Sequence, residues 1–289
     1  MHTPPGTGAP TLSITVIMLF QVTALFVREL VRRHLVETGT APNIAAYQSA
    51  WLGFAVLAVL LWPVLRQSRP RIASFFPRST VWLRLLLLSV AISLCLYLAN
   101  WGCALIRTAF LSHYAQPERV FIDGGLQWQC PDLRLTFLAL VTMSIATPVI
   151  EEVINRGLIL DTLLVRRAMF PLTQSAALFA ILHRPEAIAA AFVFGLVMAM
   201  QMRYQPWLPG PIIVHACVNA MVVIDQYCLA YPTLESTLLS LAPMQLGLLG
   251  TALFLLATSL AIQLVRWTGA GKPGSPTPAA VTMRGRRVQ

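Results

Sequence analysis

The sequence predicts an all-helical integral membrane protein, a polytopic bundle with about eight transmembrane segments. Hydrophobic residues make up 57% of the 289 residues and charged residues only 11%, whereas a soluble domain carries roughly 25% charged residues. Apolar runs of about 20 residues, the length that crosses a bilayer as a helix, recur along the chain. We therefore exclude an ordinary soluble enzyme and expect the lipid bilayer as the surroundings.

Eight apolar segments account for most of the chain. No basic region precedes the first and no small-residue cleavage site follows it, so we expect a transmembrane helix rather than a signal peptide. The fourth segment is longer than one span needs and the fifth is too short, which predicts tilted or broken helices shielded inside the bundle. The segments are expected near residues 11–27, 44–65, 80–106, 134–164, 171–184, 187–203, 208–229 and 244–267.

We expect one transmembrane domain over residues 1–268, with the motif-bearing core at about 134–230. The tail, residues 269–289, is rich in Pro, Gly, Ser, Thr and arginine, a composition typical of disordered chain. Residues 107–133 form the largest polar connection, which we interpret as a lid or substrate-contact surface.

The net charge of +10 lies mostly in short connections and in the tail. This placement suits anionic lipid headgroups, and no basic cluster on a polar domain points to nucleic acid. Orientation signals conflict, because Arg28, Arg32 and Arg33 follow the first segment whereas other arginines and the tail favour a cytoplasmic C-terminus. We expect a multi-pass protein of the plasma (inner) membrane of a prokaryote.

The five cysteines show neither zinc-finger spacing nor a disulfide framework. Cys217 and Cys228 are interpreted as small packing residues.

The most informative feature is a pair of carboxylates, Glu151 and Glu152, inside the fourth apolar segment. One carboxylate at the centre of a membrane helix costs about 2.5–3.5 kcal/mol, so the pair indicates a functional site. Arg156 follows Glu152 at i,i+4, so the two share a helix face and can form an ion pair. Glu151 lies about 100° further round the helix and stays available.

Two later segments carry further polar groups. His183 follows Phe179 at i,i+4, and Asn219 follows His215 at the same spacing. A carboxylate, two imidazoles and a carboxamide from three apolar segments supply a base, a proton partner and hydrogen-bond donors for an oxyanion. Together they predict a water-activating site.

These ordered motifs resemble those of the CPBP family of intramembrane endopeptidases, which includes the CAAX proteases and the bacteriocin-processing Abi proteins. Glu-Glu-x-x-x-Arg matches residues 151–156, Phe-x-x-x-His matches 179–183 and His-x-x-x-Asn matches 215–219. The resemblance implies a glutamic-type protease without an obligatory metal that cleaves a membrane-anchored or lipidated protein substrate.

The resemblance also implies a role for each matched residue. Glu151 would activate water with the help of His183, and His215 and Asn219 would donate to the oxyanion. Glu152 and Arg156 would hold the site in shape, and Arg156 could contact a substrate carboxylate.

Two alternatives remain open. Glu151, His183 and His215 could instead hold zinc with water as the fourth ligand, although the His-Glu-x-x-His helix of common zinc proteases is absent. A non-enzymatic transporter or immunity-type protein could use the carboxylates to relay protons, but no internal repeat is visible.

A simple drawing of eight spans places His183 at the end of one helix and His215 near the start of a parallel one. The two would then lie at different depths in the membrane. The catalytic hypothesis therefore requires a fifth segment that is only partly inserted, or helix breaks at the prolines Pro185, Pro206, Pro209 and Pro211.

Overall fold

The computed structural model describes residues 13–77, 82–114, 127–128, 130, 132–230 and 241–270. Long helices dominate: α1 Ile14–Glu37, α2 Pro42–Ser74, α3 Trp82–Tyr114, α8 Ile188–Tyr204, α9 Pro209–Cys228 and α11 Pro243–Ala270. The predicted lid lies largely, and the predicted disordered tail almost entirely, outside the described residues.

The predicted fold class is confirmed, because each of the eight apolar segments corresponds to a helix or a chain of helices. Six are long and apolar enough to cross a membrane, and α8 is a shorter apolar helix. A two-residue strand pair, β1 Gln127–Trp128 with β2 Leu229–Ala230, is the one addition among the described residues. The first two helices extend about ten residues beyond the apolar runs that predicted them, because their last turns carry polar residues.

The long fourth segment is a chain of five helical pieces. It consists of α4 Leu133–Ala139, η2 Leu140–Ala146, α5 Thr147–Glu152, η3 Val153–Leu160 and α6 Asp161–Val165, of which η2 and η3 are π-helical. The two carboxylates end the short α-helical piece between the π-helical ones. Since π-helical turns are rare and occur mostly at functional sites, this geometry draws attention to the same residues as the charge pattern does.

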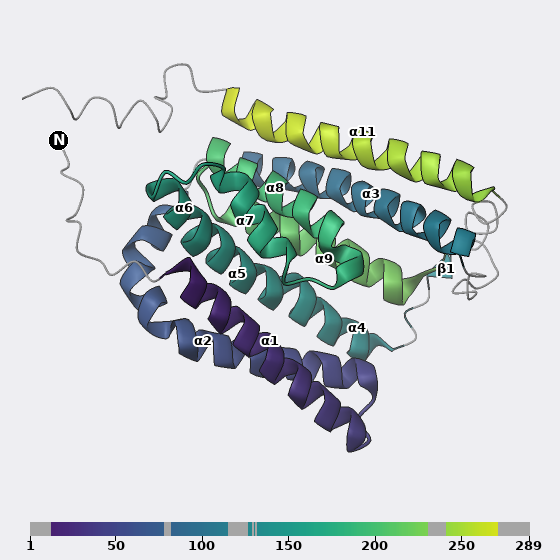
Figure 1. The fold of residues 1–289 in the computed structure, drawn as a ribbon, viewed down its shortest axis with the longest axis horizontal. Helices are drawn as coiled ribbons and strands as arrows, with labels where there is room; N and C mark the ends of the chain where they lie inside the picture. Colours follow the sequence, from purple (N-terminus) through teal and green to yellow (C-terminus); the bar gives the residue numbers. More distant parts are fainter. Residues whose placement is uncertain are drawn as a thin grey trace, which may run out of the picture.

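The helices pack in successive layers (Figure 1), with α1 and α2 on one side and α3 and α11 on the other. Between them lie the fourth segment and then α7 Pro171–Ala180, α8 and α9. One core cluster joins α1, α2 and η3 through Ile17, Leu61 and Ile159. A second joins α3, α8, α9 and α11 through Ile92, Met198 and Val214. The motif-bearing helices are thereby enclosed on both sides.

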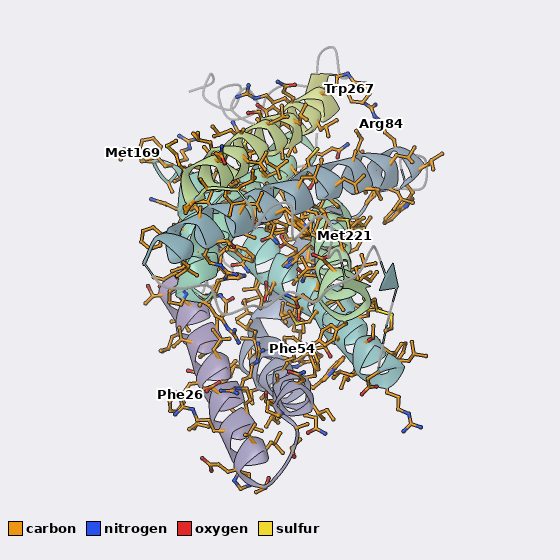
Figure 2. All side chains as sticks on the ribbon, turned by 90° about the vertical axis from the view of Figure 1, so that its right-hand side faces the viewer. Phe26, Phe54, Arg84, Met169, Met221 and Trp267 are labelled. Carbon is orange, nitrogen blue, oxygen red and sulfur yellow. A yellow bond between two sulfur atoms is a disulfide. The ribbon has the colours of Figure 1, made fainter. Side chains whose placement is uncertain are left out.

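Glycines allow α3 and α11 to approach closely. A Cβ atom at Gly102 would lie 2.7 Å from the carbonyl oxygen of Gly250, which is the small-residue packing typical of membrane helices. At one end of this helix pair the guanidinium of Arg84 lies 5.6 Å from the centre of the Trp267 ring (Figure 2). Large apolar side chains such as Phe26 on α1 point away from the bundle, as expected for a lipid-facing surface.

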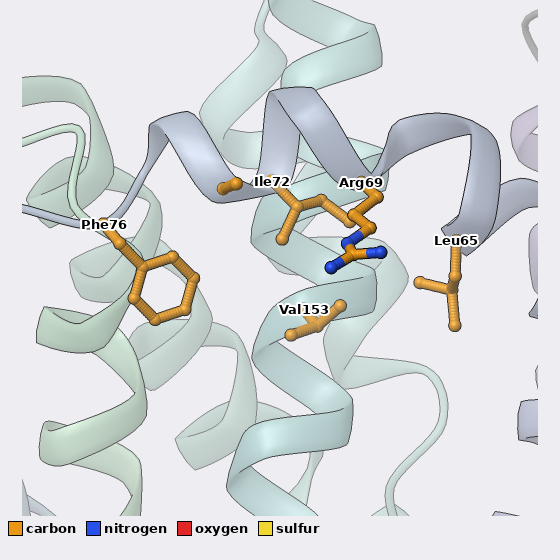
Figure 3. Close-up of a pocket in the computed structure, with 6 residues that line it drawn as sticks. Leu65, Arg69, Ile72, Phe76 and Val153 are labelled. Atoms are coloured by element: carbon orange, nitrogen blue, oxygen red, sulfur yellow. The ribbon is translucent and has the colours of Figure 1, made fainter.

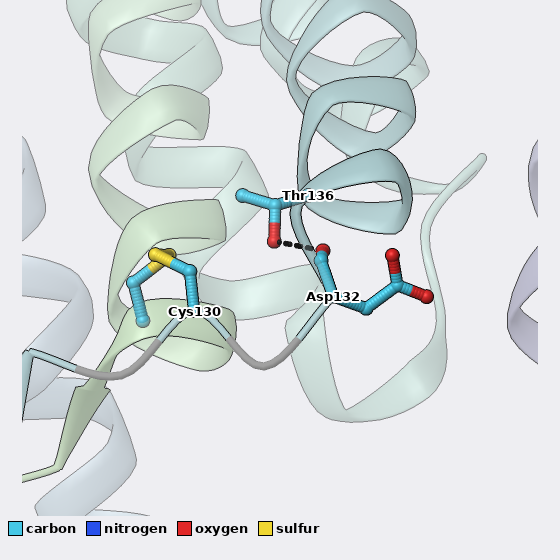
Figure 4. The surroundings of a disulfide bond; sticks show 4 residues. Cys130, Asp132 and Thr136 are labelled. Carbon is cyan, nitrogen blue, oxygen red and sulfur yellow. Dashed lines mark hydrogen bonds between the residues drawn. A yellow bond between two sulfur atoms is a disulfide. The ribbon is translucent and has the colours of Figure 1, made fainter.

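The interpretation of Cys228 as a packing residue was wrong. Cys228 forms a disulfide with Cys130, which joins the end of α9 to the chain just before α4 (Figure 4). Nearby, the Asp132 side chain caps α4 by accepting from the Leu135 amide at 2.9 Å. A sequence separation of 98 residues hid the pairing, because the two cysteines meet only once α4 and α9 are side by side.

Candidate active site

The predicted ion pair between Glu152 and Arg156 is present and fully enclosed. The Arg156 Nε atom lies 3.0 Å from Glu152 Oε2, and both side chains have 0% exposure. Arg156 Nη1 also donates to the Ser175 hydroxyl at 3.1 Å, and its guanidinium lies 5.3 Å from the centre of the Phe179 ring. Such partners are needed, since an unpaired charge here would carry a large desolvation cost.

Glu152 has a second partner that the sequence did not predict. Its Oε1 atom lies 2.9 Å from His215 Nδ1. Because a carboxylate only accepts, Nδ1 carries the hydrogen and the imidazole is oriented by Glu152. One buried carboxylate therefore links Arg156 on its own helix segment to His215 on α9.

Glu151 occupies a different environment. Its side chain is 31% exposed, and its Oε2 atom lies 4.0 Å from His215 Nε2. Its backbone carbonyl accepts from the Asn155 amide group at 2.7 Å. The imidazole of His215 therefore lies between the two carboxylates, with one ring nitrogen toward each.

His183 lies in the turn after α7 and is half-buried. Its Nδ1 atom lies 3.0 Å from the Phe179 carbonyl oxygen. A carbonyl only accepts, so Nδ1 is the donor and the neutral ring presents the Nε2 lone pair. In this tautomer the Nε2 atom can accept a hydrogen bond from a water molecule or from a neighbouring acid.

The structure places the rings of His183 and His215 beside one residue, Phe179, so the two histidines lie at similar depths. The ring centre of Phe179 lies 4.6 Å from that of His183 and 6.1 Å from that of His215. Helix α7 has only 10 residues, or about 15 Å, which is half the apolar thickness of a bilayer. The fifth segment thus ends part-way through the bundle, as one of the two alternatives required.

Asn219 is held by the first π-helical piece. Its Nδ2 atom donates to the Met143 carbonyl at 2.7 Å. Since a carboxamide nitrogen has two hydrogens, this bond accounts for one of them.

The zinc alternative finds no ready-made ligand set among the described residues, where no three His, Cys, Asp or Glu side chains are grouped closely enough to hold a metal ion. Metal independence stays a prediction.

Figure 3 shows an apolar pocket of about 400 Å³. It lies between α2 and η3 and is lined by Leu65, Arg69, Ile72, Ala73, Phe76 and Val153. Val153 follows Glu152 directly, yet none of the seven residues that define the three motifs lines the pocket.

Sequence reasoning missed Ser175 and Phe194. Ser175 binds Arg156, and the Phe194 ring lies 4.9 Å from the His215 ring, centre to centre. A serine and a phenylalanine in apolar segments carry no signal of their own, because such residues are ordinary in membrane helices.

Residues 133–221 match the family model described as type II CAAX prenyl endopeptidase Rce1-like. The match covers all three motifs, so the resemblance inferred from them is confirmed over this segment. No curated protein and no solved structure matches the chain.

Proposed function

From the match of residues 133–221 to the Rce1-like CAAX endopeptidase family model, we infer that the chain is an intramembrane hydrolase that cleaves a peptide bond with water activated by Glu151. The observation that carries the proposal is the contrast between neighbouring carboxylates. Glu152 is neutralised by Arg156 and enclosed, whereas Glu151 is 31% exposed and can reach water.

In this mechanism Glu151 takes a proton from water, and the resulting hydroxide attacks the scissile carbonyl carbon. The proton then passes to the leaving amine as the carbon–nitrogen bond breaks. His183 positions the water by accepting through Nε2, since its Nδ1–H is committed to the Phe179 carbonyl.

His215 and Asn219 would stabilise the tetrahedral oxyanion. The Nδ1–H of His215 is already committed to Glu152, so Nε2 can donate only when the ring carries both protons. Asn219 would use the hydrogen that does not bind Met143. Donors held before the reaction contribute strongly in a site that excludes bulk water.

Glu152 and Arg156 act as positioning residues. Glu152 fixes the ring of His215, and Arg156 fixes Glu152. Because Arg156 has 0% side-chain exposure and contacts Glu152, Ser175 and Phe179, we assign the recognition of a substrate carboxylate to other residues.

The substrate class we propose is a membrane-anchored protein with a lipidated cysteine near its C-terminus, in keeping with the name of the family. The test is cleavage in detergent of farnesylated peptides by wild type, Glu151→Gln and His183→Ala. Both variants should lose at least about 10²-fold in kcat/KM, the lower end of what a positioned acid or base contributes.

Arg33→Gln is the matched control, because Arg33 is 67% exposed on α1 and, among the described residues, forms its ion pair with Glu29 alone. It should retain full activity. Undiminished cleavage by a folded Glu151→Gln protein would remove Glu151 from the mechanism.

We also propose an orientation in a prokaryotic plasma membrane. The end of α2 contacts the start of α6 through the Arg71–Asp161 ion pair. Directly after α2, the Phe75 carbonyl accepts a hydrogen bond from the Leu208 amide at the start of α9. Arginines gather at this end, which favours the cytoplasm: Arg66, Arg69, Arg71, Arg166, Arg167 and Arg203. The Cys130–Cys228 disulfide lies at the opposite end of α9, where an oxidising compartment would preserve it.

Reporter fusions check this orientation. A fluorescent protein that folds only in the cytoplasm should be bright at the C-terminus and dark in the 115–126 connection. The reverse pattern would invert the assignment.

A further inference from the structure

Two adjoining pockets form one groove between α2 and the fourth segment. The pocket of Figure 3, of about 400 Å³, lies at the end of α2. A second pocket, of about 160 Å³, lies nearer the start of that helix, and every residue that lines it is apolar. Leu65 and Val153 line both pockets, so the two are continuous. We call the pair the α2 groove.

The α2 groove has the length of a lipid chain. On α2 its lining residues run from Phe54 to Arg69, which corresponds to about 22 Å at the rise of an α-helix. The apolar half of one leaflet is about 15 Å thick. An acyl chain can therefore lie along the groove from the level of the headgroups to the middle of the bilayer.

Arg69 supplies the groove with a positive charge. Its guanidinium points toward Val153, across the pocket (Figure 3). Among the residues that the structure describes, no ion pair within 4.0 Å joins Arg69 to a carboxylate, whereas Arg71 pairs with Asp161. An apolar groove that ends in an uncompensated guanidinium matches a molecule with an apolar chain and an anionic head, because guanidinium groups bind phosphate through paired N–H donors.

The groove and the candidate active site use different faces of α5. Val149 and Ile150 line the groove together with residues of α2. Glu151 and Glu152 follow them, and both lie within 4.0 Å of His215 on α9. A chain in the groove would lie on the α2 side of the segment, while the carboxylates face α9. This separation favours a lipid of the bilayer over the lipid group of a substrate that is being cleaved.

We propose that the α2 groove is a specific site for an anionic phospholipid, with an acyl chain between α2 and α5 and its phosphate on Arg69. A zwitterionic headgroup carries its own cation, so a single guanidinium favours a headgroup with net negative charge. The arginines gathered at this end of the bundle favour the same lipids. The bound chain adds contacts between α2 and the segment that carries Glu152. No step of cleavage is needed for this site to exist.

The test is photolabelling of the full chain in phosphatidylcholine nanodiscs. The probe is phosphatidylglycerol with a diazirine on one acyl chain, present at a fraction far below saturation, and mass spectrometry locates the labelled peptides. Label should concentrate in residues 54–76 and 149–154. Unlabelled phosphatidylglycerol should compete with the probe, and additional phosphatidylcholine should not.

Two matched pairs of variants test the head and the chain separately. Arg69→Gln should lower labelling of the groove at least about tenfold, the equivalent of one charge-assisted hydrogen bond. Arg66→Gln removes the same charge from α2 but lies outside both pockets, so it should retain the label. Ala58→Phe fills the second pocket and should lower labelling, whereas Val59→Phe, at a position that is 74% exposed and lines neither pocket, should not.

Ala58 and Arg69 are both exposed in the structure, so these variants are expected to fold, and far-UV circular dichroism checks this. Equal labelling of Arg69→Gln and Arg66→Gln would show that only general surface charge attracts the probe, and the proposal would be wrong. Equal competition by the two phospholipids would show ordinary contact with the bilayer and would also contradict it. Competition by a farnesylated peptide, but not by phosphatidylglycerol, would assign the groove to the substrate instead.

Discussion

Glu151 and Glu152 are neighbours in the chain and opposites in environment. Glu152 has 0% side-chain exposure and contacts both Arg156 and His215, whereas Glu151 is 31% exposed and lies 4.0 Å from the nearest ring nitrogen. The 100° between successive residues of a helix is enough to bury one carboxylate fully and to leave the other partly exposed. The same carboxylate group can therefore stabilise the fold at one position and take part in the reaction at the next.

The comparison predicts that stability depends on Glu152. Glu152→Gln leaves Arg156 enclosed without a counter-charge, which typically costs about 3–5 kcal/mol. The free energy of unfolding, measured by denaturing-detergent titration in mixed micelles, should fall by that amount.

Glu151→Gln is the matched control, because it makes the same change one residue earlier. Its partial exposure predicts a change below about 1 kcal/mol. If Glu151→Gln and Glu152→Gln lost equal amounts of unfolding free energy, the contrast between the two carboxylates would be wrong, since both would then be structural.

A smaller effect is expected where Arg156 meets α7. Ser175→Ala removes the hydroxyl that accepts from Arg156 Nη1 at 3.1 Å. Hydrogen bonds to charged groups contribute about 1.5–3 kcal/mol, so the free energy of unfolding should fall by an amount in this range in the same titration.

Ser144→Ala provides the control for this second prediction. The Ser144 hydroxyl is also buried, but it has no hydrogen-bond partner among the described residues. Its removal should be neutral or slightly stabilising. A loss as large as that of Ser175→Ala would mean that burial, and not the bond to Arg156, determines the cost.

The sequence predicted the helical fold and the Glu152–Arg156 ion pair, because both depend on patterns that a helix imposes. Apolar runs of bilayer length gave the segments, and i,i+4 spacing gave the Glu152–Arg156 pair. Contacts between segments could not be read in this way. The bond from Glu152 to His215 spans 63 residues, and no local pattern records which face of α9 meets the fourth segment.

The same limit explains the other omissions. Cys228 pairs with Cys130 across 98 residues. Arg28 was expected beyond the first apolar segment, whereas it lies within α1 and is half-buried, with its Cβ close to Gly53 of α2. The π-helical pieces also escaped prediction, since the hydrophobic pattern of the fourth segment does not distinguish π-helical from α-helical turns.

Phe179 lies beside both the enclosed Arg156 and the two histidines, so its truncation should lower both stability and activity. Phe179 is 2% exposed, and its ring lies near His183, His215 and the Arg156 guanidinium. Phe179→Leu keeps an apolar side chain and should cost about 1 kcal/mol of stability, through lost ring and cation–π contacts. Activity should fall proportionally more, because misplaced catalytic groups lose rate steeply.

Phe192→Leu is a suitable control, because Phe192 packs at the edge of the same cluster and no ring contact to either histidine is described for it. The measurement is kcat/KM beside the unfolding titration. Equal loss of activity in both variants would show that the ring fills space without orienting the histidines.

The smallest expected effect is that of a zinc chelator, which tests whether Glu151 acts as a base or as a metal ligand. If Glu151 acts as a base for free water, prolonged treatment with a zinc chelator should change kcat/KM by less than about twofold, because no ligand is removed. If zinc were bound by Glu151, His183 and His215, activity should vanish and return with added Zn²⁺. The contrast between the two carboxylates would then have another origin, since Glu151 would be open in order to bind a metal rather than to take a proton. Glu152, held by Arg156 and His215, would keep its structural role under either outcome.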